Sequence, residues 1–224
     1  MKTTVLIADD HAIVREGLRT MLESQPDMEV VTSVTDGREA LEFAQKLRPD
    51  IVIMDIAMPK LNGIDATAKI CKVLPEVKVI ILSMHDTAEH VHRAFQAGAK
   101  SYLLKESTGW ELLNAIRTVS SGRRYLSRSI DARELDRQEG SGSPLQRLSR
   151  REREILQLVV EGHSSTEIGR LIALSSKTVD SYRSRLMQKL AIGDVTGLVK
   201  FAIQFGLTEL QQVPQQPPDI QHHI

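Results

Sequence analysis

The stretch VIMDIAMPKLNG, residues 52–63, decides the fold of the N-terminal half of the chain. An apolar run leads directly into Asp55, and the turn-forming residues Pro59, Asn62 and Gly63 follow it. A short apolar run that ends at turn residues is typical of a strand buried on both faces of a parallel sheet. An acidic residue that ends such a strand lies at the carboxyl edge of the sheet, where folds of this class bind their ligands.

Other short runs rich in β-branched residues flank this one, and stretches with helical apolar spacing separate them. The pattern predicts repeated strand–helix units around a parallel sheet, with five strands and five helices between residues 1 and 125. The expected strands are residues 4–8, 29–34, 51–54, 78–82 and 101–104. We expect an α/β doubly wound, flavodoxin-like sheet with the strand order 2-1-3-4-5.

Polar residues follow the apolar runs at the ends of four of these strands. Asp9 and Asp10 follow the first strand, Asp55 the third, Ser83 the fourth and Lys105 the fifth. The expected strand order brings these ends together at one crevice of the sheet. Three carboxylates crowded there repel one another unless a cation is bound, and Mg²⁺ prefers such oxygen ligands. The sequence therefore predicts a Mg²⁺ site where Lys105 and Ser83 also contact a phosphoryl group.

The motifs VLIADDH (residues 5–11), VIMDIAMPKLNG (52–63), IILS (80–83) and SYLLKES (101–107) resemble the receiver domain of bacterial two-component response regulators. The resemblance covers about residues 3–122. It implies that a sensor histidine kinase phosphorylates Asp55. It also implies that Asp10 binds Mg²⁺ directly, that Asp9 binds it through water, and that Asp55 and the carbonyl group of Ala57 complete the metal site.

The same resemblance implies that Ser83 and Tyr102 form a switch pair and that Lys105 binds the phosphoryl group. Two residues depart from the usual receiver pattern. Met84 stands where a smaller residue is usual, beside the path to the phosphate. Glu106 follows Lys105 where many receivers have proline.

Other interpretations of these residues remain open from the sequence. A single aspartate at a strand end often caps the next helix, so Asp10 alone fits a capping role, and His11 is more typical of a turn or cap than of catalysis. A Mg²⁺-dependent phosphohydrolase with Asp55 as nucleophile is an alternative function, but that class needs a second aspartate where Ala57 stands. A receiver that binds proteins independently of phosphorylation is a further alternative function. The complete set of pocket residues counts against it.

The C-terminal part, residues 148–210, has no strand pattern and is expected to be an all-α domain. Apolar spacing predicts four helices at residues 150–161, 165–172, 176–190 and 196–205. Gly162 ends the first, Ser164 or Ser165 caps the second, and Ser175 or Ser176 caps the third after a short turn. A short turn between two helices of this kind predicts a helix-turn-helix.

The third of these helices carries a polar face that is free to enter a DNA groove. Its apolar residues share one side, so Lys177, Ser181 and Ser184 point away from the domain. Within residues 176–191, basic residues outnumber the single acid Asp180, although the chain as a whole has 29 basic and 29 acidic residues. The basic residues are Lys177, Arg183, Arg185 and Lys189. Nucleic-acid attraction is therefore expected to be local to this helix.

Residues 148–192, LSRREREILQLVVEGHSSTEIGRLIALSSKTVDSYRSRLMQKLAI, resemble the DNA-binding domain of LuxR-type and NarL-type regulators. The resemblance implies that Asp180, Ser181 and Ser184 approach base edges while Lys177 lies nearer phosphate, with Arg185 adding positive charge. Asp180 is suited to accept a hydrogen bond from cytosine N4. The helix at residues 196–205 resembles the dimerisation helix of these regulators, although packing within the domain explains its apolar face almost as well.

The remaining segments set the context of the two domains. Residues 126–147 mix charges with Gly and Ser and predict a linker, with a loose helix near residues 130–135; residues 211–224, rich in Gln and Pro, predict a disordered tail. A lone Cys71 and the absence of a long apolar run favour a cytoplasmic protein that does not enter a membrane. The predicted function is a non-enzymatic response regulator whose phosphorylation promotes a homodimer that binds a double-stranded DNA operator.

Overall fold

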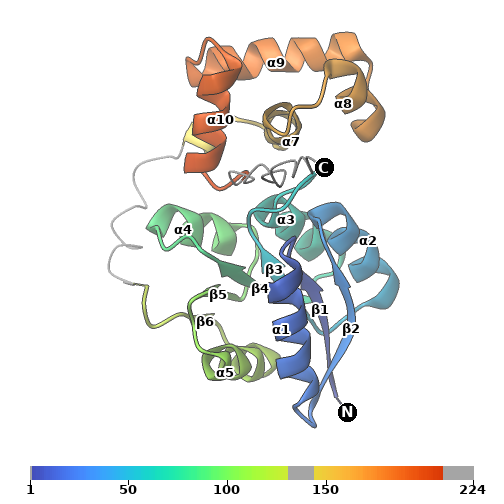
Figure 1. Cartoon of the computed structure of the whole chain (residues 1–224), viewed down its shortest axis with the longest axis vertical. Helices are drawn as coiled ribbons and strands as arrows, with labels where there is room; N and C mark the ends of the chain where they lie inside the picture. Colours follow the sequence, from blue (N-terminus) through green and yellow to red (C-terminus); the bar gives the residue numbers. More distant parts are fainter. Residues whose placement is uncertain (1, 131–143, 209–224) are drawn as a thin grey trace, which may run out of the picture.

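The computed structural model describes residues 2–130 and 144–208 of the 224-residue chain, which form an α/β domain and a helical domain (Figure 1). The α/β domain is built on a parallel sheet with the strand order β2-β1-β3-β4-β5-β6. Its strands are β1 (Thr3–Ala8), β2 (Met28–Val34), β3 (Ile51–Asp55), β4 (Lys78–Ser83), β5 (Ser101–Leu104) and β6 (Tyr125–Leu126). The doubly wound parallel fold and the order of its first five strands agree with the sequence prediction.

The sixth strand corrects the prediction of a five-stranded sheet. β6 has only two residues, Tyr125 and Leu126, which pair in parallel with Ser101 and Tyr102 of β5. Two residues are too few to show an alternating or apolar pattern, so periodicity does not reveal such a strand. The position of β6 extends the α/β domain into the segment that the sequence assigned to the linker.

Five helices cover the two faces of the sheet, as the alternating pattern predicted. One face is covered by α1 (Ala12–Glu23) and α5 (Gly109–Ser120). The other is covered by α2 (Gly37–Leu47), α3 (Gly63–Val73) and α4 (Ala88–Gln96). Each strand alternates between the two cores, because successive side chains of a strand point to opposite faces. Val5 and Ile7 belong to the α1/α5 side, while Leu6 and Ala8 belong to the other.

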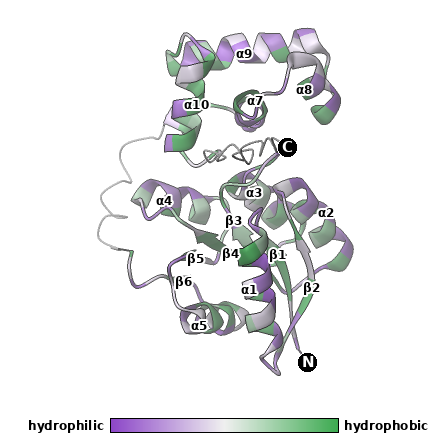
Figure 2. Cartoon of the chain, viewed as in Figure 1, coloured by the Kyte–Doolittle hydropathy of each residue, from purple (hydrophilic) through white to green (hydrophobic). Residues whose placement is uncertain are grey.

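The hydropathy of the chain follows this layering. Figure 2 shows apolar residues along the central strands and polar residues on the outer sides of the helices. The central strands are apolar throughout because helices cover both of their faces. Gly98 follows α4 with φ of 108°, a left-handed conformation that glycine adopts at little cost.

The C-terminal domain contains a short 3₁₀ helix, η1 (Pro144–Arg147), and four α-helices. These are α7 (Arg150–Val160), α8 (Ser165–Ile172), α9 (Ser176–Leu190) and α10 (Val195–Gln204). Ser149 and Ser164 each form a capping box with the glutamate three residues later, and Ser175 caps α9. These caps fix the starts of α7, α8 and α9, so the predicted helix-turn-helix of α8 and α9 is present.

Both ends of the expected linker pack against a domain. Ile130 is buried in the core on the α2/α3/α4 side of the sheet, and Leu145 is buried in the C-terminal core. The helix expected near residues 130–135 and the tail at residues 211–224 lie outside the described residues, as does most of the linker. Within the described ranges, no helix is long and apolar enough to cross a lipid bilayer.

The two domains lie against each other, with α7 facing the receiver-like α/β domain and α9 on the opposite side of the C-terminal domain (Figure 1). His90 of α4 lies at this boundary and is buried, with 3% of its surface exposed. Its ring stacks on that of His85 at 4.4 Å between centroids, and its Nδ1 lies 2.6 Å from the Thr87 hydroxyl. Burial, reinforced by His85 and Arg93, lowers the pKa of His90 to about 3.

We expect His90 to make the protein less stable as the pH falls below about 6.5, the ordinary histidine pKa. A histidine with a lowered folded-state pKa stays neutral in the folded protein while it gains a proton in the unfolded chain. Between pH 7 and pH 5 this group should cost about 2 kcal/mol in the free energy of unfolding. Denaturant titrations should show a smaller pH dependence in His90→Gln, and an equal dependence in both proteins would contradict the assignment.

Candidate functional site

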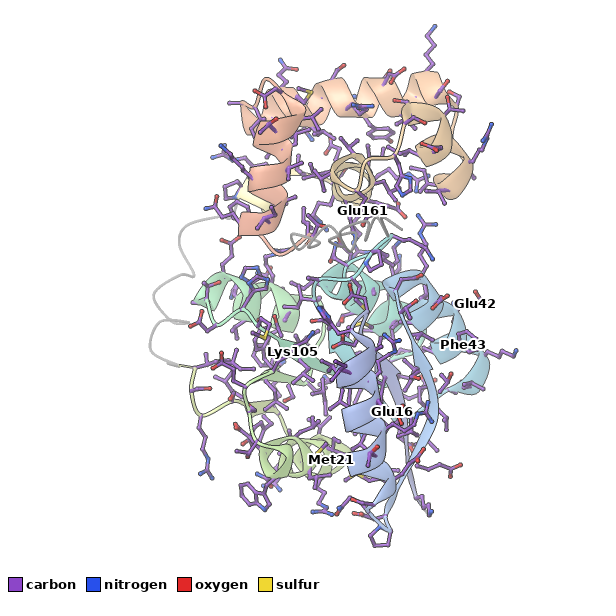
Figure 3. The ribbon with its side chains drawn as sticks, viewed as in Figure 1. Glu16, Met21, Glu42, Phe43, Lys105 and Glu161 are labelled. Atoms are coloured by element: carbon purple, nitrogen blue, oxygen red, sulfur yellow. The ribbon has the colours of Figure 1, made fainter. Side chains whose placement is uncertain are left out.

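Two buried carboxylates and one ammonium group meet at the carboxyl edge of the sheet. Asp9 and Asp55 are each 2% exposed. The Lys105 Nζ lies 2.9 Å from Asp9 Oδ2 and 3.0 Å from Asp55 Oδ2. Figure 3 shows Lys105 close to the start of α1. The ammonium therefore bridges the two carboxylates, as the positions of these residues at strand ends led us to expect.

Strand register puts these side chains next to one another. β1 and β3 are parallel neighbours in which Ala8 pairs with Met54, so Asp9 and Asp55 leave the sheet side by side. On the other side of β3, Asp55 pairs with Leu82, one residue before Ser83. The backbone N–H of Ile56 donates to Asp55 Oδ1 at 2.8 Å and helps to fix that carboxylate.

The charge state of Lys105 follows from its neighbours. Burial alone favours the neutral amine, but the Asp55 and Asp9 carboxylates outweigh that effect and raise the pKa of Lys105. The group therefore stays a cation at neutral pH. Breaking a buried ion pair of this kind leaves an uncompensated charge and is strongly destabilising.

The acidic cluster at this edge fits a hard divalent cation. Ligand atoms of Asp9, Asp10, His11 and Asp55 all lie within 4.8 Å of one another. Carboxylate oxygens are the ligands that Mg²⁺ prefers, and the more open side near Asp10 leaves room for the waters that Mg²⁺ retains. The His11 ring lies 2.9 Å from Asp10 Oδ1, and His11 itself is the N-cap residue of α1. Ala57, whose carbonyl the sequence assigned to the metal, is buried in the loop after Asp55.

Ser83 and Tyr102 are buried and connected through His85. Tyr102 is 0% exposed and Ser83 is 1% exposed. The Tyr102 hydroxyl donates to the His85 carbonyl at 2.7 Å, and the His85 backbone N–H donates to Ser83 Oγ at 3.1 Å. Burial raises the pKa of Tyr102, so the hydroxyl stays neutral and able to donate. The two residues therefore lie on one hydrogen-bonded path at the end of β4, while the neighbouring Met84 is 58% exposed.

The α9 helix exposes the side chains that the sequence assigned to DNA. Lys177, Asp180, Ser181, Ser184 and Arg185 are all exposed, whereas Val179 and Leu186 lie in the domain core. Asp180 accepts a hydrogen bond from Ser165 of α8 at 2.5 Å, which links the two helices of the helix-turn-helix. The Arg185 guanidinium lies over the ring of Tyr182, 4.8 Å from its centroid, and Tyr182 itself packs against the domain core.

Two of the four basic residues of α9 have partners on other helices of the C-terminal domain. Lys189 forms an ion pair with Glu152 of α7 at 2.7 Å, and Arg183 donates to Ser165 at 3.1 Å. The ion pair offsets the charge of Lys189, and the bond to Ser165 holds Arg183 against α8. Lys177 and Arg185 are both exposed, and neither forms an ion pair with another helix among the described residues.

Sequence reasoning did not identify Gln157, a fully buried residue of α7 whose contacts cross between the domains. Its side chain bonds Asn62 and Met58 in the loop after Asp55. A polar residue within the apolar run ILQLVV was the available signal, because a buried amide needs hydrogen-bond partners. Asn62 was noted only as a turn residue, and it also caps α3 through the Asp65 N–H.

Comparison with known proteins agrees with this architecture. The family model described as response regulator receiver domain matches residues 5–117, and the one described as bacterial regulatory proteins, luxR family, matches residues 146–202. The transcriptional regulatory protein DegU of Brevibacillus brevis is 36% identical, with 94% of this chain and 97% of DegU covered. LiaR of Bacillus subtilis (strain 168), also a transcriptional regulatory protein, is 39% identical, with coverages of 88% and 95%.

A solved structure extends the likeness across both domains. RcsB of Salmonella enterica serovar Typhimurium, bound to a promoter in the presence of the phosphomimetic BeF₃⁻, gives a TM-score of 0.62 at 28% identity, covering 90% of this chain and 98% of that one. A LuxR-family two-component response regulator from Aurantimonas sp. SI85-9A1 gives 0.58 at 35% identity, covering 63% and 100%. The chain belongs to the two-component response regulators that join a receiver domain to a LuxR-type DNA-binding domain, and it is a transcription regulator.

Gly63 should be essential to the shape of the pocket, because a Cβ atom there would overlap the carbonyl oxygen of Asp55. Gly63→Ala must push the backbone of Asp55 or the start of α3 away, and overpacking of this kind costs roughly 1–3 kcal/mol or more. Gly17→Ala is the matched control, since Gly17 lies within α1 with nothing near its added Cβ and should gain about 0.5–1 kcal/mol. Equal free energies of unfolding for the two variants would contradict this role of Gly63.

Proposed function

We propose that Asp55 accepts a phosphoryl group from a histidine kinase and that this phosphorylation controls operator binding by the C-terminal domain. The observation that carries the proposal is the pairing of buried Asp55 with Lys105 beside the Asp9 carboxylate. This arrangement pairs the buried Asp55 carboxylate with a cation, which lies beside the oxygen that reacts.

The transfer follows from the groups at the sheet edge. A carboxylate oxygen of Asp55 attacks phosphorus, the bond from phosphorus to the kinase histidine nitrogen breaks, and that nitrogen keeps the electron pair. The product is an aspartyl phosphate. Lys105 then contacts the new negative oxygens, and the Ser83 hydroxyl donates to one of them. The phosphoryl group carries about −1.5 to −2 charge beside these two side chains, in place of the single negative charge of the Asp55 carboxylate.

Asp9, Asp10 and Asp55, with the carbonyl of Ala57, are the residues that would hold Mg²⁺. When bound, the ion neutralises the negative charge of the carboxylates and of the phosphoryl group as they approach. Asp9 and Asp10 supply the oxygen ligands and orient them, while Lys105 balances the charge on the opposite side. The clustering of these oxygens is the support for this part of the proposal.

Ser83 and Tyr102 would transmit the new charge to the rest of the receiver. If the Ser83 side chain turns to donate its O–H to the phosphoryl group, the oxygen that now accepts from the His85 N–H moves. A change at His85 also alters the acceptor of the Tyr102 hydroxyl. The phosphorylated protein would then shift an existing equilibrium toward a homodimer that binds two half-sites.

On DNA, Lys177 would contact phosphate, with Arg185 adding positive charge, while Asp180, Ser181 and Ser184 approach base edges. The exposure of all five side chains on one helix supports this assignment. Solved structures of RcsB in complex with DNA are similar to this chain over both domains, with TM-scores of 0.56 and 0.62. The family relatives are regulators of transcription, which favours a regulator over a phosphohydrolase.

Asp55→Asn should abolish acid-labile phosphate incorporation from acetyl phosphate, because an amide is not a nucleophile for this transfer. Asp86→Asn, an exposed change of the same chemical type in the loop before α4, is the matched control and should label normally. Labelling of the wild-type protein should also require Mg²⁺ and stop on addition of a chelator. Near-normal labelling of Asp55→Asn would refute the proposal. Labelling that persists without Mg²⁺ would refute the proposed requirement for Mg²⁺.

DNA affinity should depend strongly on salt and on Lys177. If each protomer neutralises about three to four phosphates, the logarithm of affinity falls with the logarithm of salt concentration at a slope of about −5 to −7 for a dimer. Lys177→Ala should weaken binding to all sequences and flatten the slope, whereas Asp180→Ala should change the preference at one base position of each half-site.

Lys72→Ala removes the same charge from the exposed end of α3 and is the matched control for Lys177→Ala. Its affinity and slope should equal those of the wild-type protein. If a folded Lys177→Ala also keeps both values, α9 does not contact DNA as proposed.

A further inference from the structure

Three arginines line one cavity between α3, α4 and α7. The cavity has a volume of about 230 Å³, and Arg93, Arg150 and Arg153 lie in its wall. Among the described residues that line it, Asp65 of α3 is the one carboxylate. Three positive charges against one negative charge give the wall a net charge of +2. Figure 1 shows α3 and α4 on the side of the α/β domain that faces α7.

The Arg93 guanidinium is buried without a carboxylate in contact with it. Arg93 is 8% exposed, and arginine is almost never buried to this extent unless it is paired. Within the described ranges it forms no ion pair and makes one hydrogen bond, from Nη1 to the Phe205 carbonyl at 2.8 Å. Burial lowers the pKa of Arg93, while Asp65 and Glu89 act in the opposite direction from a greater distance. The group remains a cation at neutral pH, because the ordinary arginine pKa is far higher.

The other two arginines differ in how they are held. Asp65 Oδ1 lies 3.0 Å from Arg153 Nη2, and the Leu148 carbonyl accepts from Arg153 Nη1 at 2.9 Å. Arg153 is therefore a fixed part of the wall. Arg150 is the first residue of α7 and is exposed, with no ion pair in the described part of the chain. Its side chain can turn toward an anion in the cavity.

A purely structural role explains only part of this arrangement. Phe205 is the C-cap residue of α10, and basic side chains commonly bond the last carbonyls of a helix. The bond from Arg93 to that carbonyl uses one N–H group, and a guanidinium has several more. It also supplies no negative charge, and an uncompensated buried charge is costly. An anion in the cavity would provide the missing partner.

We propose that this cavity binds a small phosphate monoester through the guanidinium groups of Arg93, Arg150 and Arg153. The planar donors of a guanidinium match the geometry of phosphate oxygens. At neutral pH a phosphate monoester carries about −1.5 to −2 charge on one compact group, which balances the wall. A monocarboxylate would leave half of the charge of the wall unbalanced, and a dicarboxylate places its two charges at opposite ends of the molecule.

The rest of the wall limits the organic part of the ligand. The apolar side chains that complete the lining are those of Ile64, Ala68, Ala97 and Leu145. Sites for drug-sized ligands have volumes of roughly 300–1,000 Å³, so this cavity of about 230 Å³ takes a smaller molecule. We therefore expect a phosphate group on a short carbon chain.

Such a site would give the regulator a second input. Arg93 belongs to α4 of the receiver, whereas Arg150 and Arg153 belong to α7 of the DNA-binding domain, so one ligand contacts both domains. The concentration of that ligand would then affect how strongly the two domains associate. The proposal does not rest on phosphorylation of Asp55, because no residue of the acidic cluster is among the described residues that line the cavity.

Isothermal titration calorimetry of the full-length protein tests the site with glycerol phosphate that carries its phosphate on a terminal carbon. The protein is first freed of Mg²⁺, so that the carboxylates around Asp55 repel phosphate from that pocket. We expect one-to-one binding with a Kd below about 1 mM. Inorganic phosphate should bind more weakly because it leaves the apolar wall uncovered. Malonate should also bind more weakly because its charges are separated, and glycerol should not bind.

Arginine variants test whether the ligand lies in this cavity. Arg93→Gln removes the buried cation and should weaken binding of glycerol phosphate by about tenfold or more, as for a hydrogen bond between charged groups. Arg150→Gln should weaken it about two- to fivefold, because exposed charges contribute less. Arg150 is exposed and lies outside both domain cores, so its variant decides the result if Arg93→Gln does not fold. Arg170→Gln, at an exposed position of α8 outside the cavity lining, is the matched control and should bind as wild type does.

Asp65→Asn should change the affinity in the opposite direction. This substitution removes the negative charge from the wall and releases Arg153 from its ion pair. Binding of glycerol phosphate should become about three- to tenfold tighter, because the freed guanidinium can donate to the ligand. A variant that only disturbed the packing would bind more weakly, and that result would contradict the electrostatic basis of the site.

Two results would overturn the proposal as a whole. One is the absence of binding at about 1 mM glycerol phosphate, and the other is equal affinity in wild type, Arg93→Gln and Arg150→Gln. Malonate that binds as tightly as glycerol phosphate would overturn the choice of a phosphate monoester. Failure of acetyl phosphate to label Asp55 would contradict the proposed function alone, so the two proposals can fail separately.

Discussion

Two carboxylates buried at one edge of a sheet, Asp9 and Asp55, share one partner, the Lys105 ammonium, which lies within 3.0 Å of each. Pairing these three side chains requires three features of the fold. The strand ends of β1, β3 and β5 must meet at one point, the Asp55 backbone must approach Gly63 without a side chain in between, and the loop from Met58 to Asn62 must leave the pocket in a fixed direction. A phosphoryl group on Asp55 would carry about −1.5 to −2 charge in place of the single charge of the carboxylate, and it would disturb all three. The same loop also contacts α7. The pocket around Asp55 and the DNA-binding domain therefore share one structural element.

Much of this architecture can be predicted from the sequence, because it depends on local patterns. Apolar runs that end in Asp55 or Ser83 identify central strands and place polar side chains at one edge, since parallel strands share a carboxyl end. Serines at 164–165 and 175–176 predict the starts of α8 and α9, because a capping signal lies within a few residues of each helix. Receiver and LuxR-type domains were both predicted in this way, and their family membership is confirmed. The roles of the individual pocket and α9 residues remain proposals for experiment.

The features that escaped prediction depend on contacts between distant residues. β6 is two residues long, and it forms because Tyr125 and Leu126 pair with the free edge of β5. From the sequence, Lys189 and Arg183 were expected on the DNA-binding face. In the structure, Lys189 forms an ion pair with Glu152 and Arg183 donates to Ser165, and both partners lie on other helices. Gln157 bonds a loop 95 residues away, and only the folded arrangement of the domains places Asn62 opposite it. Periodicity along one helix carries no information about such a partner. The polar Gln157 inside an apolar run indicated that a contact exists, but it did not identify the partner.

The central claim is that a change at Asp55 reaches the DNA-binding domain through the Met58–Asn62 loop. Amide hydrogen exchange of Asn62 and Lys60 tests it most directly, because the acceptors of both N–H groups, Gln157 and Glu161, belong to the other domain. The account predicts that both amides are protected in the unphosphorylated protein and that phosphodonor increases their exchange rates together. The Gly63 amide, which bonds within the receiver, should stay protected and serves as the internal reference. Exchange at Asn62 and Lys60 that does not change when Asp55 is fully phosphorylated would contradict the account.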